Sequence, residues 1–294
     1  EIPLRLVGSE MCIRDSIYNM TTITKACSIF FSPTHTSQKV ANAVVKGTGI
    51  ASVSQQNLTV LPVSPIHLTT DTLTVFAAPV YGGHIPPVAV ERIKEIKGEQ
   101  TPAIVMVVYG NRDYEHALEE LSALVSQQGF MVVAAATFIG EHSYSNKQYP
   151  ISAGRPNGND LQKAEAFGKK VFDKINREGI HSIDVMKIKR PKQSAWSTLR
   201  FITKVIRMRR AKRPIQAAPS ILDISACTHC GACSKGCPTQ AITIGEEQTT
   251  DATRCIRCCA CVKVCPQHIR VYETPFSKIL STCYAKEKAP QTLL

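Results

Sequence analysis

Eight of the twelve cysteines fall into two groups with identical spacing. The first group comprises Cys227, Cys230, Cys233 and Cys237, and the second comprises Cys255, Cys258, Cys261 and Cys265. Each group reads C-x2-C-x2-C-x3-C-P, and the second repeats the first at an offset of 28 residues. This spacing lets three thiolates of one loop bind three irons of a 4Fe–4S cluster, while the fourth, held ahead of a proline, points toward the other cluster. The repeat therefore predicts two 4Fe–4S clusters and one-electron chemistry.

The pattern also predicts which cysteines share a cluster. Cys265 should join Cys227, Cys230 and Cys233, and Cys237 should join Cys255, Cys258 and Cys261. Two zinc sites are the alternative, but zinc takes four tetrahedral ligands that are commonly supplied as two separated cysteine pairs. Three cysteines in one short arc fit that geometry poorly, so iron–sulfur clusters are preferred.

The region from about Ser220 to Tyr272 resembles the bacterial two-cluster ferredoxins, which implies a small α+β domain. It departs from the repeat at Cys259, which stands where the first group has Gly231. Eight ligands already complete two clusters. We therefore expect Cys259 to pack as a small buried residue or to donate a weak hydrogen bond to a cluster sulfur.

Upstream of the cysteines, short apolar runs alternate with helical patterns from Thr24 to about Gly179. The runs are Ala26–Phe31, Leu58–Leu61, Leu73–Val80, Ala103–Tyr109 and Met131–Ile139. Each is bounded by Gly, Pro or polar residues, as buried parallel strands are. Amphipathic patterns over 113–128 and 159–178 predict two of the intervening helices. The alternation predicts a doubly wound α/β domain, in which ligands bind at the carboxyl ends of the strands.

The loop after the first run is rich in hydroxyl groups. Ser32, Thr34, Thr36 and Ser37 lie where a strand should end and a helix should begin. Hydroxyls can donate hydrogen bonds to a phosphate, and a helix N-terminus adds free N–H groups and a partial positive charge. For this loop taken alone, a Ser/Thr helix cap is the alternative, because such caps are common.

Two later loops favour a flat ring above the same strand ends. The third strand leads into Tyr81 and Gly82, and the fourth leads into Gly110, Asn111 and Tyr114. Glycine lets a ring approach the backbone, and either tyrosine could stack on it. Ordinary loop packing is the alternative for each tyrosine taken singly.

The three loops together resemble the flavodoxin family over residues 24 to about 178. The resemblance implies FMN binding, with the four hydroxyl residues at the phosphate and the two later loops at the isoalloxazine ring. His35 replaces the glycine usual in that phosphate loop, which weakens the expectation of FMN. No catalytic constellation can be picked out, and Asp113, Glu141 and His142 are expected to be solvated loop residues.

Residues 185–222 carry eleven Lys or Arg and no Asp or Glu. Trp196, Leu199 and Ile202 recur at helical spacing, followed by Val205 or Ile206, which predicts a basic amphipathic helix. Such a helix can dock an acidic redox partner, lie on an anionic membrane surface or cover the protein's own sheet. Docking onto a protein, own or foreign, is preferred, and burial of the apolar stripe would set how the clusters approach the flavin. Nucleic acid is not expected, because few aromatic residues interleave the charges and no reading motif is present.

The combination resembles the flavodoxin–ferredoxin fusion proteins of anaerobic microbes. It divides the chain into a flavodoxin-like domain (20–180), a basic linker (181–219), a ferredoxin domain (220–272) and a tail (273–294) without strong periodicity. Residues 1–19 are expected to be an assembly scar, because residues 10–16 read back into codons that resemble a transposase end sequence used in sequencing libraries.

We therefore expect an electron-transfer protein that passes electrons between redox partners. The alternatives are a flavin-free flavodoxin-like domain that acts as a binding or sensor scaffold, and a flavin-dependent reductase of a small substrate. The formal charge is +12, and clusters and a flavin phosphate would reduce it but leave the protein basic, which suits acidic partners. No apolar run is long enough to span a membrane. Cysteines grouped for metal indicate a reducing compartment, so the cytoplasm is expected.

Overall fold

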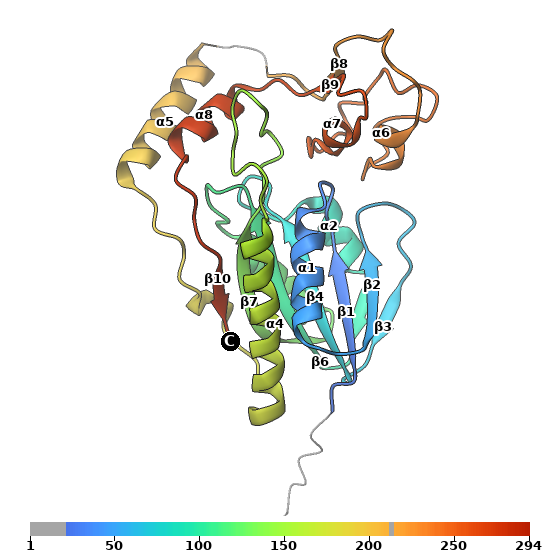
Figure 1. The fold of residues 1–294 in the computed structure, drawn as a ribbon, viewed down its shortest axis with the longest axis vertical. Coiled ribbons are helices and arrows are strands. Elements are labelled where there is room, and N and C mark those ends of the chain that lie inside the picture. Colours follow the sequence, from blue (N-terminus) through green and yellow to red (C-terminus); the bar gives the residue numbers. More distant parts are fainter. Residues whose placement is uncertain (1–21, 212–214) are drawn as a thin grey trace, which may run out of the picture.

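The computed structural model describes residues 22–211 and 215–294, so the suspected scar at 1–19 lies outside the described residues. Its main sheet contains five parallel strands (Figure 1). They are β1 (Lys25–Phe30), β2 (Ser52–Asn57), β4 (Thr72–Pro79), β6 (Thr101–Tyr109) and β7 (Phe130–Ile139). The strand order is β2-β1-β4-β6-β7, which counted along the chain is the 2-1-3-4-5 order of flavodoxin-like sheets. This confirms the predicted doubly wound fold and puts the reversal of strand order between β1 and β4.

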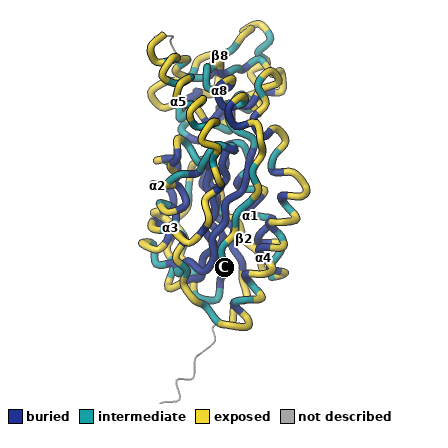
Figure 2. Tube along the Cα trace, turned by 90° about the vertical axis from the view of Figure 1, so that its left-hand side faces the viewer, coloured by how far each residue is buried: buried dark blue, intermediate teal, exposed yellow. Residues whose placement is uncertain are grey.

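Helices cover both faces of this sheet. On one face, α1 (Thr36–Gly47) and α4 (Gly158–Glu178) bury side chains against the strands. On the other face lie α2 (Pro87–Ile93) and α3 (Ala117–Gln127). Figure 2 shows the buried strands as a dark centre with exposed helix surfaces on either side. The two helical patterns expected from the sequence are therefore confirmed as α3 and α4.

One expected strand is wrong. The sequence favoured Leu58–Leu61, but β2 is the preceding polar segment Ser52–Asn57. Because β2 is at the edge of the sheet and most of its residues are exposed, it carries no apolar run. Leu58 follows the strand directly and is fully buried in the core, which explains the misleading signal.

The cysteine-rich region folds into a small unit above the strand ends (Figure 1). It contains a two-stranded antiparallel pair, β8 (Ser220–Ile221) with β9 (Arg270–Val271), and two short helices. These helices are α6 (Ala232–Lys235) and α7 (Ala260–Val264), and each begins inside a cysteine group. A second small pair, β3 (Ile66–Leu68) with β5 (Ile96–Gly98), lies beside the main sheet.

The linker and the tail both form regular structure. The linker contains the short 3-10 helix η1 (Val185–Lys187) and the helix α5 (Ala195–Arg210), which packs against α8 (Pro275–Cys283) of the tail. The tail ends in β10 (Gln291–Leu293), which pairs antiparallel with β7 and becomes the sixth strand of the main sheet. The tail therefore returns from the cysteine-rich unit to the α/β unit. Among the described residues, no helix has the length and apolar character needed to cross a membrane.

Candidate redox site

Two small cavities lie among the cysteine loops, and each is lined by four of the eight motif cysteines. Cys227, Cys230, Cys233 and Cys265 line one of them, called the first-motif cavity below. Cys237, Cys255, Cys258 and Cys261 line the other, called the second-motif cavity. Each cavity draws three thiols from one group and the fourth from the other group. Cross-ligated cubic clusters need this distribution of thiolates, so the donor set fits them.

The backbone of the two motifs repeats as well. Positive φ angles occur at His229, Gly231 and Gln240 and again, 28 residues later, at Arg257, Cys259 and His268. Cys259 has φ 58° where Gly231 has φ 70°, so a cysteine takes a left-handed conformation that favours glycine. Its side chain is buried, and its Sγ lies 3.7 Å from the carbonyl oxygen of Arg257. The expectation of a small buried residue at this position is confirmed.

The two motifs differ in their access to solvent. Cys230 of the first motif is exposed, whereas Cys258 and Cys261 of the second motif are buried. Burial is the main reason why the pKa of Cys258 rises to about 12 and that of Cys261 to about 11. A thiol must lose its proton to bind a metal, so metal binding at the second motif has to displace protons from these two thiols.

The loop between β1 and α1 has the form of an anion site. His35 occupies the N-cap with φ 62°, which reproduces the turn that glycine would make, and its exposed ring contacts Gln38 through Nδ1 and Oε1 at 3.0 Å. The Ser32 hydroxyl accepts a hydrogen bond from the Gln38 amide at 3.1 Å and so acts as a cap. The buried Ser37 hydroxyl has no partner among the described residues. A buried hydroxyl normally has one, so this orphan atom fits a bound phosphate.

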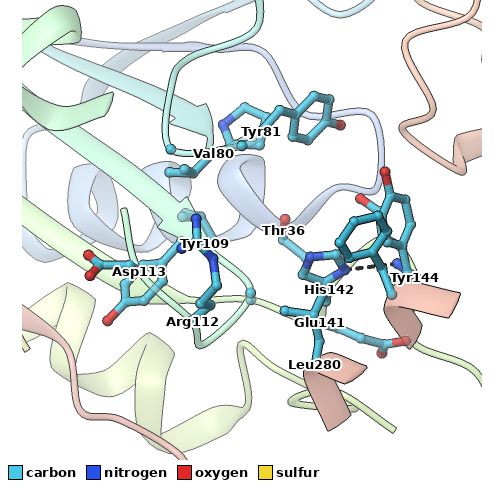
Figure 3. Close-up of a pocket in the computed structure, with 18 of the residues that line it drawn as sticks. Thr36, Val80, Tyr81, Tyr109, Arg112, Asp113, Glu141, His142, Tyr144 and Leu280 are labelled. Atoms are coloured by element: carbon cyan, nitrogen blue, oxygen red, sulfur yellow. Dashed lines mark hydrogen bonds between the residues drawn. The ribbon is translucent and has the colours of Figure 1, made fainter. Parts of the chain in front are cut away.

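A much larger cavity, about 590 Å³ in volume, lies above the carboxyl ends of the strands, and we call it the central cavity (Figure 3). The strand-end loops contribute Thr34, Thr36, Tyr81, Gly82, Gly110, Arg112, Glu141, His142 and Tyr144 to its wall. The rest of the wall includes Phe201 of α5, Phe276 and Leu280 of α8, and Ile256 and Arg257 of the second motif. The volume is within the range of cofactor sites, which are commonly a few hundred to about 1,000 Å³.

Of the predicted ring contacts that follow β6, Gly110 lines the central cavity, whereas Asn111 and Tyr114 do not. At Gly110, an added Cβ would stand 2.3 Å from Cδ2 of His142, so only glycine fits this part of the cavity wall. Asn111 is buried, and its amide donates hydrogen bonds to the carbonyl oxygens of Tyr284 at 2.7 Å and Lys286 at 3.0 Å. Tyr114 is buried in the core. Neither Asn111 nor Tyr114 is part of the central cavity's wall, and Asn111 holds the tail instead.

Asp113, Glu141 and His142 all line the central cavity, so the expectation that they are only solvated loop residues is wrong. His142 Nδ1 accepts a hydrogen bond from the Tyr144 amide at 3.0 Å (Figure 3). Burial, with help from the charges of Arg112 and Lys263, lowers the pKa of His142 to about 4. The ring is therefore neutral at pH 7. Glu141 and His142 follow the last parallel strand. That position could have predicted their place in the site, since the carboxyl ends of parallel strands meet at one edge of the sheet.

The central cavity and the second-motif cavity share a wall. Ile256 lines both of them. Tyr81 also lies near this motif. Burial raises its pKa well above the ordinary value, and the neighbouring thiols of Cys258 and Cys259 raise it further. By contrast, no residue is common to the walls of the first-motif cavity and the central cavity. The second motif is thus the one that faces the central cavity.

Residues 220–284 match the family described as the 4Fe-4S dicluster domain. This end of the chain is a ferredoxin-type domain. No curated protein matches the chain. The chain is thus an iron–sulfur electron-transfer protein, whose ferredoxin-type domain follows a flavodoxin-like domain in the sequence.

Solved structures similar to this one include several flavodoxins. One is a flavodoxin from the domain Archaea, with 11% sequence identity, a TM-score of 0.35, and coverage of 52% of this chain and 99% of that one. A Streptococcus pneumoniae flavodoxin has 14% identity, a TM-score of 0.36, and coverage of 51% and 99%. The flavodiiron protein from Giardia intestinalis has 15% identity and a TM-score of 0.34, with coverage of 52% of this chain but only 36% of that one. The flavodoxin-like topology of this chain is established by its strand order. The similarity to these solved structures is too low to add to that.

Several polar contacts hold the ferredoxin-type domain on the flavodoxin-like domain. The buried guanidinium of Arg92 donates hydrogen bonds to the carbonyl oxygens of Leu58 at 2.7 Å and Thr59 at 2.6 Å, and also to that of Pro238. Pro238 directly follows Cys237 of the second-motif cavity. The ammonium group of Lys263 in α7 pairs with the Glu141 carboxylate. These contacts, one through Pro238 of the first motif and one through Lys263 of the second, hold the second-motif cavity over the loops that form the central cavity.

The linker helix α5 contributes to the site with a face other than the expected one. Phe201 reaches the central cavity, and its ring centroid lies 5.6 Å from that of Tyr284. Trp196, Leu199 and Ile202 are all exposed, so the expectation that this stripe packs between the modules is wrong. The helix instead turns Phe201, Val205 and Met208 toward α8, because these positions recur every three to four residues on its opposite side.

Proposed function

We propose that this electron-transfer protein carries two 4Fe–4S clusters in the ferredoxin-type domain and FMN in the central cavity, and that electrons pass between them within one chain. The observation that carries the proposal is the wall shared through Ile256. A cluster in the second-motif cavity would be separated from a flavin in the central cavity by little more than this side chain and Tyr81. The proposal keeps the division of the chain at 20–180, 181–219, 220–272 and 273–294.

The residues of the central cavity support FMN as its ligand. Thr34 and Thr36 line the cavity, and Ser37 has an unpartnered hydroxyl at the N-terminus of α1, where free N–H groups favour an anion. We assign the phosphate to Thr34 and Thr36, which line the cavity, and to the neighbouring Ser37, which is buried and not part of the wall, with Ser32 supporting the loop as a cap. Tyr81, Gly82 and Gly110 remain as candidates to contact the ring, and Tyr144 joins them.

The flavin, when bound, would accept or donate one or two electrons, whereas a cluster exchanges one. The residues of this chain position and shield that exchange. His142 is neutral at pH 7, so it adds a polar edge to the cavity without adding a charge. Phe201, Phe276 and Leu280 add apolar side chains to the wall of the cavity.

The solvent-accessible thiol of Cys230 supports an entry point for electrons at the first motif. A redox partner that docks beside the first-motif cavity would exchange electrons with that cluster, and the second cluster would relay them to the flavin. The formal charge of +12 favours an acidic partner. The two motifs would then form a directed path from the surface to the central cavity.

The test is cofactor analysis of anaerobically purified protein, followed by rapid mixing. We expect about eight iron and about eight sulfide per chain, together with one FMN released on denaturation. After reduction by a small acidic donor protein, the flavin absorbance should change at a rate that does not depend on protein concentration. Stoichiometric zinc without sulfide would overturn the cluster assignment. Full cluster content without bound or bindable FMN would instead support the flavin-free scaffold.

A further inference from the structure

Helix α5 carries an apolar ridge that no part of the described chain covers. The ridge consists of Trp196, Leu199, Ile202 and Ile206, which are 66%, 52%, 46% and 43% exposed. These positions recur every three to four residues and so lie along one side of the helix. Four large apolar side chains in a row on the surface mark an interaction site, whereas scattered single ones do not.

Arginines flank the ridge on both sides. At about 100° per residue, Arg200 and Arg207 fall on one side of the ridge and Arg209 on the other. All three are exposed, and no carboxylate among the described residues pairs with them. The whole segment 185–222 contains no Asp or Glu. The surface around the ridge is therefore positive, and its complement must be negative.

The opposite side of α5 is fixed to the protein. Phe201, Val205 and Met208 pack into a cluster with residues of α8, and Lys204 donates a hydrogen bond to the Thr282 hydroxyl at 2.6 Å. Figures 1 and 2 both place α5 at the outside of the molecule, beside α8. The ridge is thus held outward in one orientation and needs no rearrangement to bind a surface.

We propose that α5 binds the surface of an anionic lipid bilayer, with the helix parallel to the membrane plane and the ridge inserted among the headgroups. A helix with Trp, Leu and Ile on one side and arginines beside them is the pattern of interfacial helices. Tryptophan is enriched at membrane interfaces. Arginines at both edges are placed to contact acidic headgroups when the ridge is inserted, and each nearby cation strengthens such binding.

The chemistry of the ridge favours lipid over an acidic protein. A stable protein interface buries about 800 Å² on each partner and relies on shape complementarity and hydrogen bonds. The ridge is the crest of a single helix, and its members have no hydrogen-bonding side chain apart from the Trp196 indole. A fluid bilayer can accommodate such a ridge without a preformed complementary surface. Docking of an acidic protein is retained as an outcome of the test.

The experiment uses the full-length holoprotein and vesicles. Trp196 is the only tryptophan, so its emission reports on this helix alone. With mixed phosphatidylglycerol and phosphatidylcholine vesicles at low salt, we expect co-sedimentation, a blue shift of the emission and quenching by brominated acyl chains. Pure phosphatidylcholine should bind far less. These readouts need no electron transfer, so they can fail or succeed independently of the proposed function.

Two matched pairs of variants sharpen the test. Changing Arg200, Arg207 and Arg209 to Glu should weaken vesicle binding by about 100-fold or more, whereas changing the exposed Lys163, Lys169 and Lys170 of α4 to Glu should have little effect. Ile202→Asp should abolish insertion, whereas Ile244→Asp, at a residue that is 70% exposed in the ferredoxin-type domain, should not.

Three outcomes would overturn the proposal. One is the absence of binding to anionic vesicles at low salt. Another is binding without a blue shift or quenching, which would mean adsorption by charge alone. The third is a blue shift with an acidic protein donor but not with vesicles, which would assign the ridge to a protein partner.

Discussion

The two cysteine motifs have the same spacing, the same proline and the same backbone turns, yet they lie in different surroundings. The first motif exposes Cys230 to solvent, and the cavity that it lines shares no residue with the central cavity. The second motif is buried against the flavodoxin-like domain and shares Ile256 with the central cavity. A repeated sequence thus predicts repeated ligation, whereas the position of each copy in the fold decides whether it faces solvent or the central cavity.

The largest effects are expected when a single cysteine ligand is removed, in one variant from the first motif and in another from the second. Cys230→Ser and Cys258→Ser should each lower iron and sulfide from about eight to about four per chain. On rapid mixing with a reduced acidic donor, Cys258→Ser should slow flavin reduction by at least about 100-fold, because the cluster beside the central cavity is lost. Its remaining cluster should still bleach.

In Cys230→Ser, by contrast, the donor should react more slowly, but the remaining cluster and the flavin should bleach together. The reverse pattern, with flavin reduction intact in Cys258→Ser, would show that the first motif is the one next to the flavin.

Removal of Arg92 should weaken the attachment of the second-motif cavity, whose Cys237 directly precedes Pro238. Arg92→Ala leaves the buried carbonyls of Leu58 and Thr59 without their donor and deletes the contact with Pro238. We expect a loss of roughly 2–3 kcal/mol in the free energy of unfolding, measured by denaturant titration with circular dichroism. The exposed Arg177, which pairs with its neighbour Glu178, is the matched control, and Arg177→Ala should cost less than about 0.5 kcal/mol. Equal losses would mean that Arg92 does not anchor the domains.

Equivalent positions in the repeat offer a finer comparison. Ile256 and Thr228 are 28 residues apart and follow the first cysteine of each motif. Ile256→Ala removes part of the wall of the central cavity, so FMN affinity should fall by about 5- to 10-fold. Thr228→Ala should leave FMN affinity unchanged. Fluorescence titration of flavin-depleted protein measures both, and a similar loss in the two variants would argue against Ile256 as the shared wall.

The smallest expected effect is a dependence of the free energy of unfolding on pH, caused by His142 in the wall of the central cavity. The pKa of His142 is about 4 in the folded protein, below its ordinary value of 6.5. The unfolded chain therefore takes up this proton first as the pH falls, so stability drops between about pH 6.5 and pH 4 and then levels off. We expect this loss of stability to be about 1 kcal/mol. That is less than the full difference between the two pKa values would give, because the ring is partly exposed to solvent.

The measurement is the free energy of unfolding across this pH range in the protein and in His142→Gln, which should lose that part of the slope. His181→Gln, which changes an exposed histidine after α4, serves as the control. A slope that His142→Gln leaves unchanged would contradict the assignment.

Much of this architecture could be predicted before any coordinates were known. Short continuous apolar runs identified four of the five parallel strands, because strands buried on both faces are apolar throughout. Helical periodicity identified α3 and α4, because each buries one face. The edge strand β2 was not predicted, because its exposed side chains are mostly polar and form no apolar run. The tail escaped as well, because α8 and the three-residue β10 are too short for a clear period.

The sequence by itself determined the grouping of the cysteines, since the donors, their spacing and the two prolines are local features of one chain. It also determined that a loop rich in hydroxyl groups precedes α1. Tertiary structure alone decided which cysteine group faces the central cavity, that Glu141 and His142 join its wall, and that Asn111 holds the tail. It also decided that α5 turns Phe201 inward and Trp196 outward. These outcomes depend on contacts between segments far apart in the chain, and a periodic pattern marks an apolar face without naming the surface that will cover it.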